Sequence, residues 1–291
     1  TSTAGMASGP ILPDPKAEAR HHPQIEETAN GIPLVNITAP SSGGVSRNEY
    51  EMFNVPDKGA ILNNSYTLSK TELAGYVPGN NNMAERPAKI IVNEVTGTGS
   101  TSMDGFLEVA GNRADVVIAN PNGITVNGGG FINTGKAFLT TGKPVYDGED
   151  HLQRFDITGG DILIEGKGLG GKETESLAIL SRAVKINAGI WAEDLHITTG
   201  ANTVDAKTLE ASAIEGKGGR PAFALDTAAI GGMYAGRITL VGTEKGLGVN
   251  NSGTWSAEDN LTLDWNVDLK NSGTIYSKGN TDLRASRLEN D

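Results

Sequence analysis

The sequence predicts an all-β protein whose strands are stacked as a parallel β-helix. Three observations lead to this fold class: the composition, a series of short apolar runs, and an internal repeat. Of 291 residues, 39 are Gly, nearly twice the usual share, whereas aromatic residues make up only 5%. The core must therefore be built from Val, Ile, Leu and Ala around many turns, which is typical of β structure.

Short apolar runs follow one another from Ile32 onward, separated by Gly, Asn, Ser and Asp. In chain order they read IPLVNI, GAILN, AKIIVNEV, ADVVIA, GITVN, DILIE, AVKI, DLHIT, GRITLVG and NLTLDW. None of these runs is long enough for a helix of ordinary length. Each one predicts a strand.

The C-terminal part of the chain repeats itself every 20 residues. Asn251-Ser-Gly-Thr-Trp255 returns as Asn271-Ser-Gly-Thr-Ile275, and Leu263 returns as Leu283. A weaker echo lies upstream, where AGIWAEDLHIT resembles SGTWSAEDNLTL. Each unit has too few apolar residues to fold alone, so stacking is the way to bury its inward face.

Parallel stacking of such units gives a solenoid in which each coil hydrogen-bonds the next, about 4.8 Å away. Asn251 and Asn271 are candidates for a ladder of side-chain amides, with the alternative that each merely caps its own turn. An antiparallel sandwich competes as an architecture, but its strands need not repeat their sequence. The repeat favours the solenoid.

The first 29 residues lack a sustained period and contain Pro10, Pro13, Pro15 and Pro23, which cannot donate to a strand ladder. They predict an extended leader over residues 1–29, mobile up to about Glu27 because it has few apolar residues to dock.

The following segment, from Gly31 to about Val95, is not repetitive, and an open β-helix end needs a cap over its strand edges. We therefore expect one domain over residues 30–291, with the cap and first coils at about 30–112 and further coils at about 113–291.

Charge and composition exclude several classes of function. The formal net charge of −11 repels phosphate backbones and anionic membrane surfaces, so nucleic-acid binding is disfavoured. The absence of Cys excludes disulfides, thiolate zinc sites and cysteine nucleophiles. No run of 18 apolar residues occurs, so stable membrane insertion as a helix is not expected.

A glycine-rich segment from Gly166 to Gly171 matches the G-x-G-x-x-G pattern of dinucleotide-binding proteins. The following stretch KETESLAILSRAV could be a helix, and Glu193 lies where a ribose-binding acid is found. However, the chain lacks the alternation of strands and helices that such a fold requires. We therefore interpret the segment as a loop between coils and expect no cofactor.

Catalytic and metal-binding patterns are equally weak. His21 and His22 lie in the leader, His151 and His196 are expected in solvent, and no metal-ligand spacing or nucleophile motif occurs. Polysaccharide enzymes also use parallel β-helices with clustered Asp, and this enzyme class stays open as an alternative. Ten Asp residues of the coil region are scattered along the sequence: Asp147, Asp150, Asp156, Asp161, Asp194, Asp205, Asp226, Asp259, Asp264 and Asp268.

The most informative block is Asn120-Pro121-Asn122-Gly123-Ile124, set between ADVVIA and ITVN. In physical terms it predicts a turn, with Pro presetting φ and Asn-Gly accepting a positive φ. This structural interpretation is complete without any function.

The same block, with its continuation ITVNGGGFIN, resembles the signature of the two-partner secretion domain of filamentous-haemagglutinin-like adhesins and contact-dependent growth-inhibition exoproteins. Further ordered matches run through most of the chain: Ile32 to Ile37, Gly43 to Val55, Gly59 to Ser65, Ile91 to Val95, Thr140 to Pro144 and Gly231 to Val249.

The resemblance implies a right-handed parallel β-helix with an N-terminal cap and extra-helical β-hairpins. It also implies recognition in the periplasm by the polypeptide-transport-associated modules of a dedicated outer-membrane transporter. Asn120, Pro121, Asn122, Gly123 and Ile124 fall on the family's NPNG-type motif. A second Asn-x-Asn-Leu-type motif corresponds to Asn80, Asn81, Asn82 and Met83, and departs from the family at Met83.

The haemolysin branch of the family carries a Cys pair after the NPNG motif, which is absent here, so an adhesin or growth-inhibition exoprotein is favoured over a cytolysin. The leading hypothesis is a non-catalytic, monomeric secretion module of a Gram-negative exoprotein, secreted or held at the cell surface, whose β-helix templates the folding of the rest outside the cell. The alternative is an adhesin domain that binds a host receptor or glycan directly.

Overall fold

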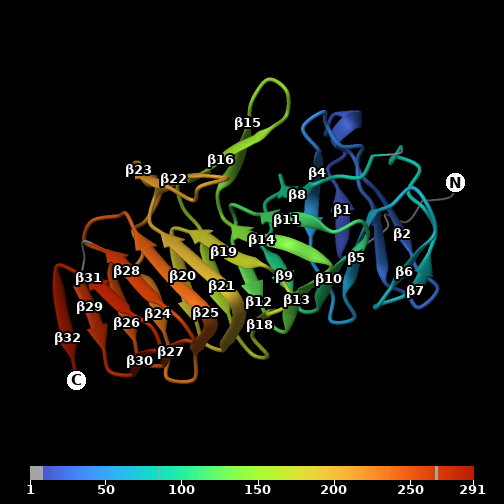
Figure 1. Ribbon diagram of the computed structural model, residues 1–291. Helices are drawn as coiled ribbons and strands as arrows, with labels where there is room; N and C mark the ends of the chain where they lie inside the picture. Colours follow the sequence, from blue (N-terminus) through green and yellow to red (C-terminus); the bar gives the residue numbers. More distant parts are fainter. Residues whose placement is uncertain (1–8, 85, 266–267) are drawn as a thin grey trace, which may run out of the picture.

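The computed structural model describes residues 9–84, 86–265 and 268–291, and it confirms the parallel β-helix. The chain winds in coils around three sheet faces, and each coil passes from face 1 to face 3 and then to face 2 (Figure 1). In the described part of the chain, no helix has the length and apolar character needed to cross a bilayer.

Face 1 consists of β4 (Val45–Phe53), β8 (Ile90–Val95), β11 (Ala114–Ala119), β14 (Thr134–Thr140), β19 (Ser176–Ser181), the second halves of β21 (Gly189–Thr199) and β25 (Gly232–Gly242), β28 (Leu261–Trp265) and β31 (Thr281–Arg284). Face 2 consists of β3 (Pro33–Asn36), β5 (Ala60–Asn64), β10 (Phe106–Gly111), β13 (Gly129–Ile132), β18 (Leu169–Gly171), the first halves of β21 and β25, β27 (Thr254–Ala257) and β30 (Thr274–Ser277). Face 3 consists of β9 (Thr101–Met103), β12 (Ile124–Val126), β17 (Asp161–Ile164), β20 (Ala183–Ile186), β24 (Phe223–Thr227), β26 (Gly248–Asn251), β29 (Asp268–Asn271) and β32 (Arg287–Asn290). All neighbours within these three faces are parallel.

The 20-residue repeat sets the register of the last coils. Asn251 pairs with Asn271, and Leu263 with Leu283, as the sequence predicts. The asparagine ladder is also confirmed: Nδ2 of Asn251 donates to Oδ1 of Asn271 at 2.8 Å, and Nδ2 of Asn271 donates to Oδ1 of Asn290 at 2.7 Å. Asn251 and Asn271 are buried inside the solenoid, so the ladder satisfies amides that water hardly reaches, and it ends at the exposed Asn290.

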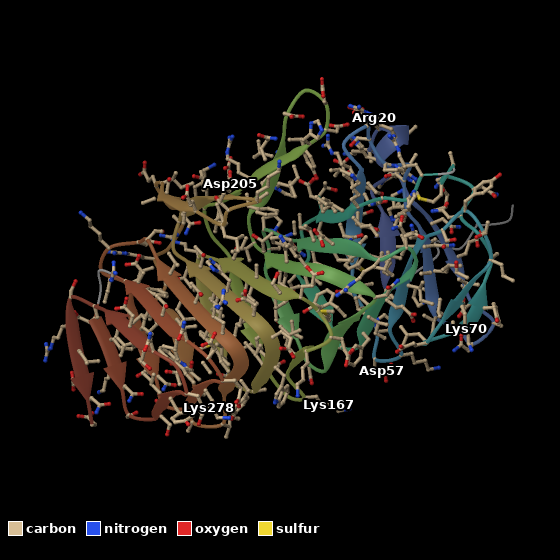
Figure 2. The ribbon with its side chains drawn as sticks, in the orientation of Figure 1. Arg20, Asp57, Lys70, Lys167, Asp205 and Lys278 are labelled. Atoms are coloured by element: carbon tan, nitrogen blue, oxygen red, sulfur yellow. The ribbon has the colours of Figure 1, made fainter. Side chains whose placement is uncertain are left out.

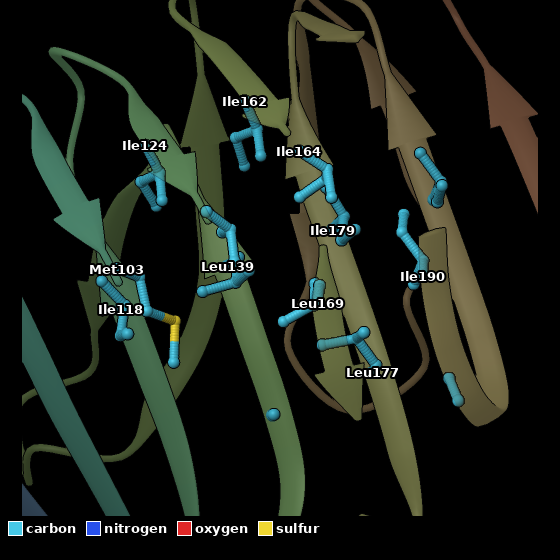
Figure 3. Close-up of a cluster of buried hydrophobic side chains, with 14 of the residues drawn as sticks. Met103, Ile118, Ile124, Leu139, Ile162, Ile164, Leu169, Leu177, Ile179 and Ile190 are labelled. Carbon is cyan, nitrogen blue, oxygen red and sulfur yellow. The ribbon is translucent and has the colours of Figure 1, made fainter. Parts of the chain in front are cut away.

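The interior is filled by aliphatic side chains from all three faces. Figure 3 shows Ile118 and Leu139 of face 1, Ile124 and Ile162 of face 3, and Leu169 of face 2 converging on the axis. Each of these side chains is at most 1% exposed. Close packing of β-branched and Leu side chains thus replaces the aromatic residues that the composition lacks.

Extra-helical strands cover part of the outer surface. An antiparallel sheet of β15 (Lys143–Tyr146), β16 (Leu152–Ile157), β22 (Asn202–Asp205) and β23 (Ala211–Ala213) packs Phe155 and Val204 over outward-facing Val117 and Phe138. This second core explains why strands such as ADVVIA are apolar on both faces.

A smaller hairpin, β6 (Ser69–Thr71) and β7 (Gly75–Val77), covers the outside of face 2 near its N-terminal end. The carboxylate of Glu108 anchors it by accepting hydrogen bonds from the backbone N–H groups of Glu72 and Leu73, at 2.9–3.1 Å and 2.9 Å.

The expected leader is not an undocked segment in its described part. Strand β1 (Ile11–Pro13) pairs antiparallel with β4, and β2 (Gln24–Glu27) pairs antiparallel with β3. Ile11 is 2% exposed and belongs to the central core. The strands cover the first edges of faces 1 and 2, so the cap begins about 20 residues earlier than the proline content indicates.

A short 3-10 turn, η1 (Ala19–His21), links β1 and β2 and reaches the long β15–β16 hairpin (Figure 2). Arg20 Nη1 lies 3.2 Å from Asp150 Oδ2, and Arg47 Nη1 lies 2.7 Å from Asp150 Oδ1. His21, expected in a mobile segment, is 5% exposed, with Nδ1 3.1 Å from Glu49 Oε2. These contacts fasten the N-terminal segment to strand β4 of the β-helix and to the extra-helical β15–β16 hairpin.

Candidate functional site

The NPNG block forms the corner between β11 on face 1 and β12 on face 3. The N–H of Gly123 donates to the carbonyl of Asn120 at 3.2 Å, which closes a four-residue turn. Pro121 supplies the fixed φ of the second position, and Gly123 has φ +113°, which favours glycine. Ile124, at 1% exposure, begins β12 and enters the core.

The Asn120 side chain is completely buried and uses its whole hydrogen-bonding capacity. Its Nδ2 donates to Gly99 O at 3.0 Å and to Thr101 Oγ1 at 2.9 Å. Its Oδ1 accepts from the N–H and Nδ2 of Asn122, at 2.9 and 3.0 Å. Asn120 therefore ties the corner to the loop that precedes β9.

Asn122 strengthens the same attachment from the surface. Its Nδ2 donates to Gly97 O at 2.8 Å and to Gly99 O at 3.2 Å. Only Pro121 and Asn122 of the five motif residues are exposed. In the folded protein, most of the motif is therefore hidden from a partner.

The second motif adopts the same turn. Met83 N–H donates to Asn80 O at 3.1 Å, and Asn82 N–H donates to Asn80 Oδ1 at 2.9 Å. The Asn80 side chain is fully buried, and its Nδ2 donates to Ile37 O and Asn63 O, each at 2.9 Å. Asn81 is exposed, in the position of Pro121 in the first motif.

The second motif differs from the first at its fourth turn position and in the contacts of its third residue. Met83 replaces glycine at the fourth turn position and is 1% exposed within the central core. Asn82 Nδ2 donates to Gln24 Oε1 at 2.6 Å and to Ile37 O at 3.1 Å. The second turn thus contacts the N-terminal segment, whereas the first turn contacts residues 97–101. The two motifs therefore form two separate corners of the β-helix.

Residues outside the predicted motifs complete both corners. Gly99 and Thr101 accept from Asn120, and Gln24 accepts from Asn82. The sequence contains a weak signal for Gly99 and Thr101, because they lie in TGTGSTS, a run of small residues between two predicted strands. Neither motif contains a titratable side chain.

The first half of the glycine-rich segment is a loop, as expected, but this loop is a corner within one coil, and Leu169, Gly170 and Gly171 belong to strand β18. Residues 165–168 connect β17 to β18, and the stretch that could be a helix instead contains β19 and β20. Across residues 9–84, 86–265 and 268–291, no group of three or more His, Asp or Glu side chains is placed to hold a metal ion.

His196 departs from the expected solvent exposure. It points away from the axis, as the alternation predicts, but it is only partly exposed, because it lines a cleft of about 430 Å³ together with Ala206 and Leu209 of the β22–β23 turn. This burial lowers the pKa of His196 to about 4. The extra-helical turn could not be seen from the alternating pattern of the strand.

A family model for the TPS secretion domain matches residues 10–277 of the chain. The chain belongs to this family. A crystal structure of the filamentous hemagglutinin secretion domain is similar over 97% of each chain, with 30% identity and a TM-score of 0.82. The TPS secretion domain is a transport module of exoproteins that leave Gram-negative bacteria through a two-partner secretion transporter, for the cell surface or the medium.

Curated relatives are far longer proteins. The "Toxin CdiA" of Yersinia pestis is 43% identical over 298 residues, which cover 94% of this chain and 9% of the relative. The "16S rRNA endonuclease CdiA" of Enterobacter cloacae is 43% identical over 287 residues, covering 97% of this chain and 8% of the relative. This TPS secretion domain therefore spans less than a tenth of the length of these proteins.

Proposed function

We propose that the periplasmic polypeptide-transport-associated modules of the transporter bind residues 120–124, and secondarily residues 80–83, before these segments fold. The burial of Asn120 carries this proposal: in the folded domain its side chain has no exposed surface and no free hydrogen-bonding group. A partner that reads this asparagine must do so while the chain is extended.

β-Augmentation is the physical mode that fits an extended segment. In this mode the segment adds a strand to an exposed sheet edge of the partner, and pockets select alternate side chains. The residues before the motif, ADVVIA, already have strand propensity and supply free backbone donors until β8 and β14 pair with them. The NPNG block would then mark the end of the bound strand.

The same domain would start the folding of the longer exoprotein outside the cell. Strands β1 and β2 close the first edges of faces 1 and 2, and each finished coil offers three parallel edges to the next. We propose that the domain does this as a monomer, because extra-helical strands already cover the apolar outer surface of face 1 and of the N-terminal end of face 2.

The test separates recognition from stability. Asn120→Ala is compared with Asn251→Ala, which also removes a buried, hydrogen-bonded amide but lies outside both motifs. Each substitution is expected to lower the free energy of unfolding by about 1–2 kcal/mol. Secreted and periplasmic protein are measured in cells with the cognate transporter, and a denaturant melt is recorded for each purified variant.

We expect Asn120→Ala to abolish secretion, Asn81→Ala to reduce it more mildly, and Asn251→Ala to leave it near the parental level. Asn81 is exposed, so its replacement tests the second motif without loss of a buried contact. Normal secretion of a folded Asn120→Ala protein would show that the motif only shapes a turn.

A further inference from the structure

Face 2 carries a row of outward positions occupied by three aromatic residues, with two glycines between the first aromatic residue and the second. Successive ladder partners place Phe106, Gly130, Gly170, Trp191 and Tyr234 in one line across five adjacent strands. The line runs parallel to the solenoid axis, with about 4.8 Å between neighbouring strands. Side chains of different coils thus form one continuous strip.

Each of the three rings packs closely over the backbone of a glycine on the same face. A Cβ atom on Gly189 would lie 2.5 Å from Cη2 of Trp191, and a Cβ atom on Gly232 would lie 2.6 Å from Oη of Tyr234. The Phe106 ring covers Gly130 in the same way and reaches Gly170. Any side chain at these glycines would lift the rings from the sheet.

Two of the rings, Trp191 and Tyr234, are nearly parallel, and all three are partly exposed to solvent. The planes of Trp191 and Tyr234 differ by 18°, and their centroids are 6.1 Å apart. Trp191 is 42%, Tyr234 39% and Phe106 40% exposed. Large flat aromatic surfaces left open in this manner mark an interaction site more often than scattered apolar residues do.

The Phe106 end of the strip opens into a cleft of about 590 Å³. Glu72, Arg113, Asn133 and Glu173 line this cleft together with Phe106. Carboxylates accept hydrogen bonds and a guanidinium donates them, so the cleft offers both partners that a hydroxyl group requires.

We propose that this aromatic strip, which we call the face-2 strip, binds an extended, uncharged glycan. The C–H groups of a pyranose face are weakly positive and pack on the negative face of an aromatic ring. Sugars at one end of the strip would stack on Trp191 and Tyr234, sugars in the middle would pass over Gly130 and Gly170, and hydroxyls at the Phe106 end would bond to Glu72, Arg113 and Glu173 in the cleft.

Other flat or extended ligands fit less well. Single-stranded nucleic acid also stacks on aromatic rings, but it needs a positively charged groove, and this chain has a net charge of −11. Proline-rich peptides dock into grooves between aromatic side chains, whereas the space beside each of these rings is taken up by its packing over a glycine of the sheet. The same net charge disfavours acidic glycans.

The test uses the 291-residue chain and uncharged hexasaccharides of β-linked glucose, β-linked N-acetylglucosamine and α-linked glucose. Binding is measured by calorimetry and by tryptophan fluorescence. Trp191 is exposed whereas Trp255 and Trp265 are 0% and 1% exposed, so a stacked sugar changes the emission of Trp191. We expect one hexasaccharide to bind, to shift this emission to shorter wavelength, and to bind more tightly than its disaccharide.

Trp191→Ala and Tyr234→Ala are each expected to weaken that binding at least tenfold without changing the denaturant midpoint. Tyr66→Ala removes an aromatic side chain that is 57% exposed outside the strip, and it should leave binding unchanged. Absence of binding to all three hexasaccharides would overturn the proposal, as would binding that survives both strip substitutions. Trp191-dependent binding of a proline-rich peptide or of phosphatidylcholine vesicles in place of a glycan would also overturn it.

Discussion

Arg182 and Glu244 face each other through two parallel hydrogen bonds, from Nε to Oε2 at 3.1 Å and from Nη2 to Oε1 at 2.9 Å. Arg182 follows β19 and Glu244 follows β25, so the pair joins coils that are distant in the sequence. Glu244 also accepts from the N–H of Ala201 at 3.1 Å, just before β22. Bidentate pairing of this kind fixes both groups in one geometry. The pair therefore fastens the base of the extra-helical sheet to the coils.

Glu244→Gln is expected to lower the free energy of unfolding by about 2 kcal/mol, because it leaves the Arg182 charge without its carboxylate. The side chain of Arg182 is only 7% exposed. Urea melts at pH 7 measure the change. Glu258→Gln is the control, because Glu258 pairs with Lys278 on the surface, and it should leave the midpoint unchanged. Equal effects of the two substitutions would contradict the role given to Arg182 and Glu244.

Asn251→Ala is expected to cost about 2 kcal/mol of unfolding free energy, since it interrupts the ladder and leaves Asn271 Oδ1 without its donor. Asn280→Ala removes an exposed amide from the same repeat and should have no measurable effect. Guanidinium melts of the two variants provide the comparison. Identical midpoints would show that the ladder contributes no net stability.

Ile11→Ala is expected to destabilise the protein by about 3 kcal/mol, because Ile11 packs in the central core and its loss leaves a cavity. Ile230→Ala makes the same change at a position that is 82% exposed and should be neutral. Thermal melts measure both. If Ile11→Ala melts like the parent, the N-terminal strand does not contribute to the folded core.

The burial of His196 predicts a pH dependence of stability. Its pKa is about 4 in the folded protein against 6.5 in the unfolded chain, so the unfolded chain binds the proton more tightly. Its contribution to stability is complete above pH 6.5 and is lost as the pH falls toward about 4. Denaturant midpoints over this interval should fall less steeply for His196→Gln than for the parent.

Asn280→Gln provides the control for this measurement, because it changes an exposed side chain that does not titrate. The control should follow the slope of the parent protein. A His196→Gln protein with the same slope as the parent would contradict the assignment.

Much of the fold could be predicted because the repeat reports the register directly: Asn251 and Asn271 are neighbours in sequence pattern and in space. The weaker upstream echo misleads by one residue. The sequence echo aligns Trp191 with Trp255. In the structure, Ile190 pairs with Met233 of the next coil, and Met233 pairs with Trp255, so Trp255 occupies the position of Ile190. Since alternate residues face opposite sides, this slip separates a 42% exposed tryptophan from a fully buried one.

The parts that could not be predicted depend on contacts between distant segments. Ile11 lies in a proline-rich stretch, and nothing local indicates that β4 offers it an edge. His196 has the pattern of a solvent-facing residue, but it lies in a cleft whose other wall includes the β22–β23 turn. For the motifs, the turn at Asn120 follows from Pro and Gly, whereas its acceptors at Gly99 and Thr101 follow only from the coil geometry.

The contacts of Asn120 determine how late in folding its side chain is buried. Its side chain needs the loop at Gly99, and its N–H donates to Thr140 O on the next strand of face 1. Parallel pairing between such separated segments makes folding slow, because loop-closure entropy is lost before contacts compensate for it. Slow folding lengthens the interval in which residues 120–124 are open to a binding partner. The parallel topology that buries Asn120 in the folded domain therefore also delays its burial.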